Sequence, residues 1–405
     1  MKRVVVTGIG IVSSIGNNRN EVLDSLKNQR SGIEFNQEYA DLGFRSHICG
    51  TIKANIKDLV PRKQLRFMGD GSAYSYISMA ESIEDADLSE EDLASKKTGL
   101  IIGSGVASGA PLVEMADTLR NKGARKVNPF YVPKIMSSCN AANLATAFKI
   151  RGYSYTISSA CATSGHCLGN AYQLIQAGEQ DLIFIGGGDE LSWVVSIAFD
   201  SMGALSSNFN DNPQSASRAY DRDRDGFVVS GGGGTIVLEE YERAKARGAK
   251  IYCEVTGYGI SSDGDDMVRP SGEGAERCMK MALKTVDGPI DYLNAHGTST
   301  PAGDITELTA INNVFSGNGQ LPHISSTKSL TGHSLGAAGV HESIYCILMM
   351  DNDFICPSVN IENLDPEADG YPIVLEPMNN HSLNSVISNS FGFGGTNCSL
   401  VFNKI

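Results

Sequence analysis

The stretch "VVVTGIGIVSSIG" at residues 4–16 returns in part as "CEVTGYGISSDG" at residues 253–264, and the two share the pattern V-T-G-x-G-I. Apolar, β-branched runs of this kind are typical of buried strands, and their glycines indicate that another segment approaches the backbone closely. A second portion that restarts with the opening motif indicates two similar halves, with chance similarity of six letters as the alternative. The basic turn "ERAKARGAK" at 242–250 places the predicted division between residues 1–248 and 249–405.

Strand-like runs alternate with helix-length amphipathic stretches along the chain. The pattern predicts strands at 3–7, 98–102 and 181–186, and helices at 20–29, 112–121 and 162–177. This alternation indicates an α/β protein whose strands are buried and largely parallel.

The opening segment has two other interpretations. Its glycines stand at 8, 10 and 16, so the G-x-G-x-x-G spacing of a dinucleotide-binding turn is absent. The same glycines interrupt the apolar run that a secretory leader needs, and no A-x-A cleavage site follows. A buried first strand that ends in a tight turn is the favoured interpretation.

Composition excludes several classes of protein. The 405 residues carry a formal net charge of −13, which argues against a broad nucleic-acid or anionic-membrane surface. No apolar run approaches the roughly 20 residues that cross a bilayer. The nine cysteines form no C-x-x-C pair and are odd in number. We therefore expect free thiols and a cytoplasmic location.

The segment "SSACATSGHCLGN" at 158–170 holds two cysteines and a histidine. Cys161 follows a strand-like run and precedes the predicted helix, where the helix dipole and free N–H groups favour a thiolate. His166 and Cys167 lie five and six residues further on and point in other directions, so a metal pair or disulfide is disfavoured. Cys161 is thus a candidate nucleophile, although this segment alone favours an inert buried cysteine.

Three downstream segments contain further polar candidates. "YLNAHGTSTPAGD" (292–304) places His296 before small hydroxyl residues, and "SSTKSLTGHSLGAAG" (325–339) places Lys328 and His333 before a small-residue helix. "SNSFGFGGTN" (388–397) has a glycine-lined backbone that can donate to an oxyanion. Each segment alone also fits a structural role.

Together these segments resemble the Cys-His-His condensing enzymes. Within that group, "PRKQLRFMGD", "SYTISSACATS" and "SGEGAERCMKMA" are most similar to the β-ketoacyl-acyl-carrier-protein synthases of type I, which elongate fatty acids by two carbons, with type II as the alternative. The resemblance implies the thiolase-like fold, in which two duplicated halves form five αβαβα layers. It also implies a homodimer, acyl carrier protein as partner, and no cofactor beyond the phosphopantetheine arm that the carrier brings.

The resemblance also assigns roles to residues. It implies that Cys161 takes the acyl chain as a thioester, that His296 and His333 stabilise the enolate of the decarboxylating malonyl group, and that backbone N–H groups of Cys161 and Phe393 hold the oxyanion. Lys328 is expected to keep the imidazoles neutral. For Glu307 and Glu342, a structural ion-pair network is the alternative to a direct role.

The resemblance further implies three sets of binding residues. The phosphopantetheine arm and the acyl chain are expected at Thr298, Thr300, Phe199, Phe227 and Phe391. Carrier docking is expected at Arg62, Lys63, Arg66, Arg125 and Lys126. A monovalent cation is expected at Asn294, Glu342, Ser388 and Asn389.

Other classes fit less well. A non-catalytic chain-length subunit would lack the nucleophile, whereas Cys161 is present. A thiolase would carry its C-terminal cysteine in another motif, and a synthase III or chalcone-synthase relative would have Asn in place of His333. A nicotinamide dehydrogenase is the remaining alternative, and it is tested by cofactor binding.

Overall fold

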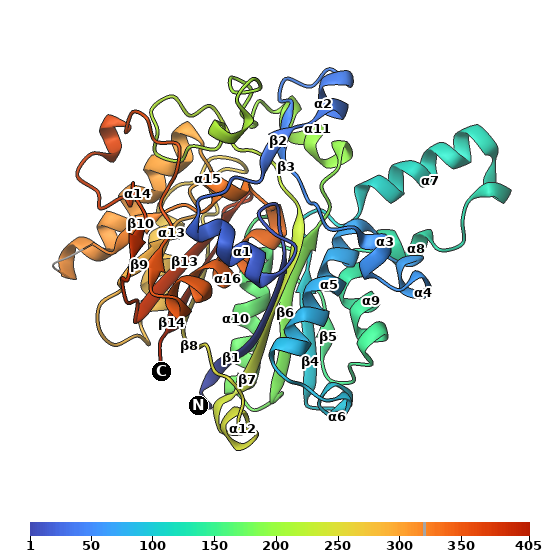
Figure 1. Ribbon diagram of the computed structural model, residues 1–405, viewed down its shortest axis with the longest axis horizontal. Coiled ribbons are helices and arrows are strands. Elements are labelled where there is room, and N and C mark those ends of the chain that lie inside the picture. The colour runs from blue at the N-terminus through green and yellow to red at the C-terminus, as the bar shows by residue number, and fades with distance from the viewer. Residues whose placement is uncertain (319–320) are drawn as a thin grey trace.

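The computed structural model describes residues 1–318 and 321–405, and it is built around one large mixed sheet (Figure 1). Neighbouring strands in this sheet follow the order β10-β9-β13-β14-β8-β1-β7-β6-β4-β5. The first half supplies β1 (Val4–Val12), β4 (Thr98–Gly103), β5 (Ser154–Tyr155), β6 (Leu182–Asp189) and β7 (Gly232–Glu240). The second half supplies β8 (Cys253–Ser262), β9 (Tyr292–Asn294), β10 (His323–Ser325), β13 (Ser385–Gly392) and β14 (Thr396–Asn403).

The two halves repeat one topology. Outward from the centre, the first half runs β1-β7-β6-β4-β5 and the second runs β8-β14-β13-β9-β10. In each half the strand that comes first in the sequence lies at the centre of the sheet, and the strand that comes last in the sequence of that half lies beside it. The halves join where β1 meets β8 in a short antiparallel contact, Val5 opposite Glu254 and Val6 opposite Cys253. The duplication expected from the V-T-G-x-G-I echo is therefore present in the fold.

The expectation of largely parallel strands is wrong. β4 pairs in parallel with β5 and β6, and β9 does so with β10 and β13, but β7 is antiparallel to both β1 and β6, and β14 is antiparallel to β13 and β8. Antiparallel and parallel strands that are covered on both faces have the same continuous apolar pattern, so the sequence did not distinguish them.

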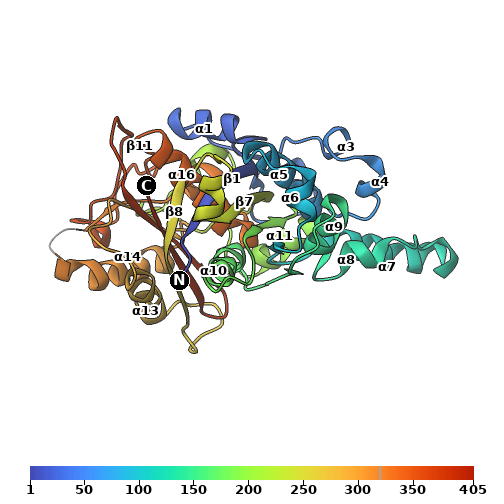
Figure 2. The same ribbon diagram turned by 90° about the horizontal axis from the view of Figure 1, so that it is seen from below.

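The helices and strands together form five layers. The central layer holds α10 (Thr163–Gln176) and α16 (Ala338–Asp351), which contact each other and strands of both halves. α5 (Asp70–Asp85) and α9 (Cys139–Phe148) cover the outer side of the first half. α13 (Glu273–Leu283) and α14 (Pro301–Phe315) cover that of the second half, giving the αβαβα arrangement (Figures 1 and 2).

The echoed glycines let a helix pack directly on the strand in each half. A Cβ on Gly10 would lie 2.0 Å from the carbonyl oxygen of Ser78 on α5. A Cβ on Gly259 would lie 1.9 Å from that of Cys278 on α13. Both glycines are required because any side chain there would displace the outer helix.

Most predicted elements lie close to the observed ones. α1 (Arg19–Lys27) and α7 (Gly109–Lys122) occupy the predicted helices at 20–29 and 112–121, and α10 occupies 162–177. Gly178 ends α10 with a φ of +77°, as expected of a C-terminal glycine. α7 buries none of its residues and projects from the body in both views (Figures 1 and 2).

Smaller elements complete the fold. The remaining helices are α2 (Gln37–Asp41), α3 (Ile56–Leu59), α4 (Arg62–Leu65), α6 (Glu90–Ala94), α8 (Tyr131–Ile135), α11 (Trp193–Ser201), α12 (Tyr241–Ala246) and α15 (Lys328–Thr331). Short 3-10 turns are η1 (Ala124–Lys126), η2 (Pro213–Ser215), η3 (Ser316–Asn318), η4 (Leu335–Ala337) and η5 (Pro366–Ala368). β2 (Ile33–Phe35) pairs with β3 (Ile48–Gly50), and β11 (Phe354–Ile355) pairs with β12 (Met378–Asn379).

The division predicted at residues 248/249 stays a prediction. It falls between α12 and β8, where the topology restarts. The largest core cluster nevertheless combines both halves, because Ile9 and Ile236 share it with Val255 and Val386. Among the helices of residues 1–318 and 321–405, none is both long and apolar enough to cross a membrane.

Candidate active site

Cys161 lies at the corner between β5 and α10. The preceding Ala160 has a φ of +47°, an uncommon conformation for a residue with a Cβ. Thr163 fixes this turn, since its Oγ1 accepts from the N–H of Ser159 at 2.8 Å and donates to the carbonyl of Ala160 at 2.7 Å. The turn therefore presents the Cys161 thiol at the start of the helix, as the sequence pattern indicated.

His333 approaches this thiol from the second half of the chain. Its Nε2 lies 3.0 Å from Cys161 Sγ. The backbone of His333 is held by two hydrogen bonds, to the carbonyl of Val228 at 2.7 Å and from the N–H of Ser230 at 2.9 Å. The imidazole is thus placed within hydrogen-bonding distance of the nucleophile by a segment that leads into the central helix α16.

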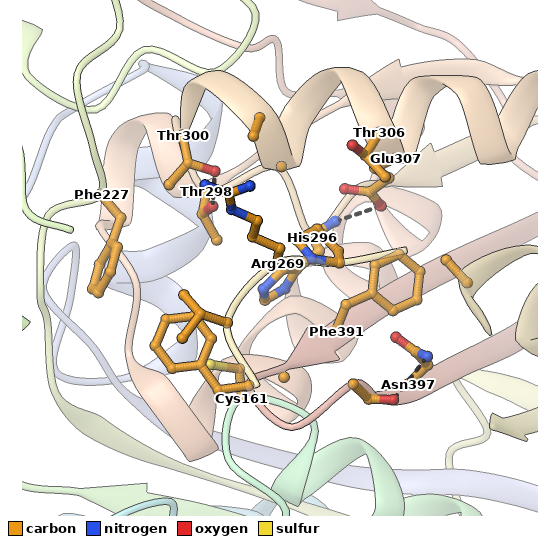
Figure 3. A pocket seen from close by; sticks show the side chains of 18 of the residues that line it. Cys161, Phe227, Arg269, His296, Thr298, Thr300, Thr306, Glu307, Phe391 and Asn397 are labelled. Atoms are coloured by element: carbon orange, nitrogen blue, oxygen red, sulfur yellow. Dashed lines mark hydrogen bonds between the residues drawn. The ribbon is translucent and has the colours of Figure 1, made fainter. Parts of the chain in front are cut away.

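His296 completes a triad of reactive groups. Its ring centroid lies 5.3 Å from that of His333, and the rings are nearly perpendicular. Glu307 on α14 accepts from the N–H of His296 at 2.9 Å and from that of Gly297 at 2.8 Å, which fixes the histidine's backbone (Figure 3). Ligand atoms of Cys161, His296 and His333 all lie within 4.8 Å of one another.

Both imidazoles are held neutral. Burial lowers the pKa of His296 and of His333 well below the usual value, and the nearby Lys328 ammonium lowers each pKa further. A neutral imidazole donates from one nitrogen only. The two Nδ1 atoms have no hydrogen-bond partner among the described residues.

The expectation of a resting thiolate at Cys161 is not met. Burial raises the pKa of the thiol to about 12, against the opposing effects of the Lys328 charge and of hydrogen bonds from the backbone N–H groups of Phe393 and Cys161 itself. Desolvation of the charged sulfur outweighs the helix start. The pair at rest is a neutral thiol beside a neutral imidazole.

Lys328 and Glu342 form a fully buried ion pair behind the histidines. The ammonium contacts Glu342 Oε1, and both side chains are almost inaccessible to solvent. Burial raises the pKa of Glu342 to about 7, while the lysine charge opposes this rise. Glu307, also buried, has its pKa raised by desolvation. The ion pair of Glu342 with Lys328 and the backbone hydrogen bonds of Glu307 are the contacts expected of glutamates with a structural role.

The β13–β14 turn brings the backbone N–H of Phe393 near enough to the Cys161 thiol to affect its pKa. Burial raises the pKa of the Cys161 thiol, and the backbone N–H groups of Phe393 and of Cys161 itself oppose this rise. Gly392 makes this approach possible, because a Cβ there would lie 3.1 Å from the Cys161 nitrogen. Two N–H groups that converge beside a nucleophile suit the oxygen of a tetrahedral intermediate.

A pocket of about 240 Å³ opens onto the triad. The predicted arm-binding and acyl-pocket residues all line it: Phe199, Phe227, Phe391, Thr298 and Thr300. The Phe199 and Phe227 ring centroids lie 5.3 Å apart, and Phe227 stands edge-on to His333 at 5.5 Å. The hydroxyls of Thr298 and Thr300 lie 3.2 Å apart (Figure 3).

A buried ion pair that sequence reasoning missed holds the threonine loop. Asp304 accepts from the N–H groups of Ser299 and Thr300, and Arg224 Nε lies 3.2 Å from the Asp304 carboxylate. Ser299 has a φ of +70°, so the loop needs such anchoring. Asp304 ends the segment "TSTPAGD", so the sequence motif already marked it as a candidate. Arg224 lies 80 residues earlier, and no motif there indicates a link to this loop.

The predicted docking cations are exposed. Arg62 and Lys63 lie on α4, Arg66 follows it, and Arg125 and Lys126 lie on η1. Within the described residues, these five cations form no salt bridge of their own. The Arg66 guanidinium stacks 4.6 Å from the ring centroid of Phe67, which orients it at the surface.

The structure fits the predicted cation site only in part. Glu342 Oε2 and Ser388 Oγ are buried without a hydrogen-bond partner in the described part of the chain, as a cation's oxygen ligands would be. The amide oxygens are engaged: Asn389 Oδ1 accepts from Ser399, and Asn294 Oδ1 accepts from Thr327. Two of the four side chains thus fit a cation, and the site stays a prediction.

The remaining cysteines behave as packing residues. All nine are free thiols, and eight of them are buried. Cys167 lies inside α10 and is inaccessible, while His166 hydrogen-bonds to Ser159 at 2.6 Å and to the Asn397 carbonyl at 3.1 Å. The disulfide and local-metal interpretations of residues 158–170 are not supported by this geometry.

A thiol at a helix start, two neutral imidazoles and paired backbone donors, drawn from both halves of a thiolase-like fold, define a Cys-His-His condensing enzyme. The chain belongs to the β-ketoacyl synthase family. The family models "Beta-ketoacyl synthase, N-terminal domain" and "Beta-ketoacyl synthase, C-terminal domain" match residues 1–244 and 252–362.

Curated relatives place it beside the type I enzymes. It is 57% identical to "3-oxoacyl-[acyl-carrier-protein] synthase 1" of Haemophilus influenzae over 100% of this chain and 99% of the relative, and 57% identical to that of Escherichia coli over the whole of both. 3-Oxoacyl and β-ketoacyl are the same chemical group. A synthase 2 of Rhizobium meliloti is more distant, at 39% identity over 100% of this chain and 99% of the relative.

Solved structures agree on the fold. A β-ketoacyl synthase from Burkholderia phymatum matches with a TM-score of 0.93 at 34% identity over the whole of both chains. A ketosynthase solved in complex with its type II PKS acyl-carrier protein matches with a TM-score of 0.91 at 28% identity, again over both whole chains.

Proposed function

We propose that this protein is an acyltransferase that condenses malonyl-acyl carrier protein with an enzyme-bound acyl group, as a β-ketoacyl-acyl-carrier-protein synthase of type I. The observation that carries the proposal is the contact between Cys161 Sγ and His333 Nε2 at 3.0 Å, beside His296 in one pocket. The side chains supply a nucleophile, a proton acceptor and hydrogen-bond donors, so the chemistry requires no resident organic cofactor.

In the first half reaction, the Cys161 sulfur attacks the thioester carbonyl of the acyl carrier. The thiol proton passes to His333 Nε2, because the neutral imidazole lies within hydrogen-bonding distance of a thiol that is not ionised at rest. The carbon–sulfur bond to the carrier arm breaks, and the departing arm thiolate takes that proton. The acyl group is left on Cys161 as a new thioester.

In the second half reaction, the malonyl carboxylate leaves as CO2 and its bonding electron pair becomes an enolate. The neutral imidazole of His296 donates a hydrogen bond to the enolate oxygen, and that of His333 does so once its proton has moved to the nitrogen that faces the pocket. The enolate carbon attacks the acyl-Cys161 carbonyl, whose oxygen is held by the N–H groups of Cys161 and Phe393. Collapse expels the Cys161 thiolate, which takes up a proton, and releases a product two carbons longer.

The proposed partner is acyl carrier protein. Relatives at 57% identity carry this partner in their name, and a structural neighbour was solved with its own carrier. An acidic enzyme needs a local basic surface to bind an acidic carrier. Arg62, Lys63, Arg66, Arg125 and Lys126 are exposed and offer one.

The proposal extends to assembly, location and ions. Helix α7 buries none of its residues and exposes Leu112 and Leu119 by about half, which supports a homodimer that covers such apolar side chains. A cytoplasmic location accords with nine free thiols. A monovalent cation beside Glu342 and Ser388 would act structurally.

The direct test supplies a medium-chain acyl-carrier and malonyl-carrier and follows the product by mass spectrometry. A β-ketoacyl-carrier two carbons longer, with one CO2 released per product, is expected. Acyl groups exchanged between carriers without CO2 release would identify a transferase instead, and the absence of any acylation would identify a binding subunit.

Carrier docking is tested separately with the double variant Lys63→Glu/Arg66→Glu. Acyl transfer from the carrier is expected to fall, while transfer from a small acyl thioester stays unchanged. The variant Arg30→Glu/Lys245→Glu, with the same charge change at other exposed positions, is the control. Equal losses with both donors would exclude this docking site.

A further inference from the structure

The pocket that leads to Cys161 contains one formal cation. Among its described lining residues, Arg269 is the single lysine or arginine, whereas Asp263, Asp266 and Glu307 are acidic. His296 and His333 contribute no charge because burial lowers their pKa values. An anionic substrate that enters this pocket therefore meets Arg269 as its one positive lining group.

The nearby aspartates are already used to build the loop that carries this arginine. Asp263 accepts from Asn397 at 2.7 Å and from the N–H of Ser271 at 2.9 Å. Asp266 accepts from the N–H groups of Val268 and Arg269 at 2.7 and 2.8 Å. Because these carboxylates bind the backbone, the loop is shaped without occupying the guanidinium.

The guanidinium of Arg269 is available for a ligand. Within residues 1–318 and 321–405, no carboxylate forms a salt bridge with it, and the residue is exposed. The loop is also tied to the catalytic turn, since Gly394 N–H donates to the carbonyl of Met267 at 2.8 Å. Figure 3 shows the side chain directed into the pocket, toward Thr298 and Thr300.

We propose that Arg269 binds the phosphodiester of the carrier-borne arm and so sets the affinity for carrier-bound substrates. The inference rests on the proposed function. A guanidinium pairs with a phosphate through two parallel hydrogen bonds. The malonyl carboxylate is the other anion of the substrate, but a cation held on it would stabilise the group that must leave as neutral CO2 and would slow the reaction.

The test compares Arg269→Gln and Arg269→Lys with the wild type and with Arg30→Gln, which removes the same charge from an exposed position away from the pocket. Rates of Cys161 acylation are measured with decanoyl-carrier and with decanoyl-N-acetylcysteamine, which lacks the phosphate. KM and kcat for malonyl-carrier are measured in the condensation assay.

For Arg269→Gln we expect KM for malonyl-carrier to rise about three- to tenfold with kcat nearly unchanged, and acylation by subsaturating decanoyl-carrier to slow by a similar factor. Arg269→Lys should be intermediate, the phosphate-free thioester and Arg30→Gln should match the wild type, and added salt should narrow the difference. An effect confined to malonyl-carrier, an equal effect on the phosphate-free thioester, or no effect would each overturn the proposal. A wild-type protein that makes no condensed product would instead refute the proposed function.

Discussion

The two halves of the molecule share a scaffold but differ in what they place at equivalent positions. β1 and β8 each lie beneath an outer helix that packs on paired glycines, Gly10 under α5 and Gly259 under α13. The central helices α10 and α16 each follow an outermost strand, β5 in one half and β10 in the other. Cys161 precedes the first of these helices and His333 precedes the second.

This equivalence explains how distant parts of the chain form one reactive pair. α10 and α16 contact each other in the central layer, so the segments that lead into them converge. The repeated scaffold brings residues 161 and 333 together, and the side chains there then supply different chemistry: a thiol in one half and an imidazole in the other.

The connections after the equivalent strands β6 and β13 differ most. β13 and β14 are joined by a short turn through Phe393, Gly394 and Gly395, and the Phe393 N–H lowers the pKa of the Cys161 thiol against the effect of burial. β6 and β7 are joined by residues 190–231, which include α11 and contribute Phe199 and Phe227 to the pocket wall. The short connection thus contributes the Phe393 N–H beside Cys161, and the long connection contributes Phe199 and Phe227 to the pocket wall.

The largest expected effect comes from removing the distinctive group of the first half. Cys161→Ser should lower condensation by roughly 10³-fold or more, because the hydroxyl is a poor nucleophile beside a neutral imidazole. Malonyl decarboxylation should persist in part, since both histidines remain. CO2 release and β-ketoacyl product are measured in parallel, with Cys167→Ser as a packing control. Substantial condensation by the variant would contradict the assignment of the nucleophile.

Removing the equivalent group of the second half should have the next largest effect. His333→Ala is expected to lower condensation by about 10²–10⁴-fold, since the acceptor for the thiol proton and one enolate donor are both lost. Acylation of Cys161, followed by mass spectrometry in a single turnover, should also slow. Acylation at the wild-type rate would show that another group accepts the proton.

The shared scaffold predicts matching stability effects. Gly10→Ala and Gly259→Ala each place a Cβ about 2 Å from a helix carbonyl, so we expect each to cost about 1–3 kcal/mol of unfolding free energy. Gly43→Ala, where a Cβ meets no atom within 4 Å, controls for open space, although its positive φ adds some strain. Denaturant unfolding measures all three. A large loss at one glycine and none at the other would break the proposed equivalence.

The smallest expected effect is in the pH profile. The pKa values of His296 and His333 lie well below 6.5, so kcat should show no inflection near pH 6.5 as the pH falls. Because these pKa values are lower in the folded state than in the unfolded state, the stability they contribute is present above about pH 6.5 and is lost as the pH falls below it.

Lys328→Met sharpens this test. Loss of the ammonium removes one cause of the low imidazole pKa values, so those values should move toward 6.5. A decrease of kcat at low pH should then appear, or begin at a higher pH than in the wild type. The measurement is kcat against pH at saturating substrate for both proteins. An inflection near 6.5 in the wild type would contradict neutral, buried imidazoles.

Much of the fold and the site could be predicted from local patterns. The glycine echo indicated the duplication, and Gly178 marked the end of α10, because both depend on short-range backbone requirements. Cys161, His296 and His333 stand in motifs whose turns are encoded locally. Their resemblance to a known family supplied the roles, which spacing alone left open.

The rest depended on contacts between segments far apart in the chain. The predicted strand directions were wrong. Burial on both faces gives the same apolar pattern to β7, which is antiparallel to its neighbours, and to β4, which is parallel to its neighbours. The raised pKa of Cys161 reflects burial by several elements, which the helix start at 161 did not reveal. Arg224 reaches Asp304, and Arg269 reaches the pocket, only through tertiary structure.

The most direct test of the division of labour between the halves is the mass of the His296→Ala variant after sequential addition of acyl-carrier and malonyl-carrier. His296 does not contact the sulfur in the manner of His333, so Cys161 should still gain the acyl group. One of the two enolate donors is absent, so the acyl group should remain on Cys161 much longer after malonyl-carrier is added, whereas the wild type releases it promptly as a product two carbons longer. A variant that fails to become acylated, or that discharges as fast as the wild type, would contradict the account.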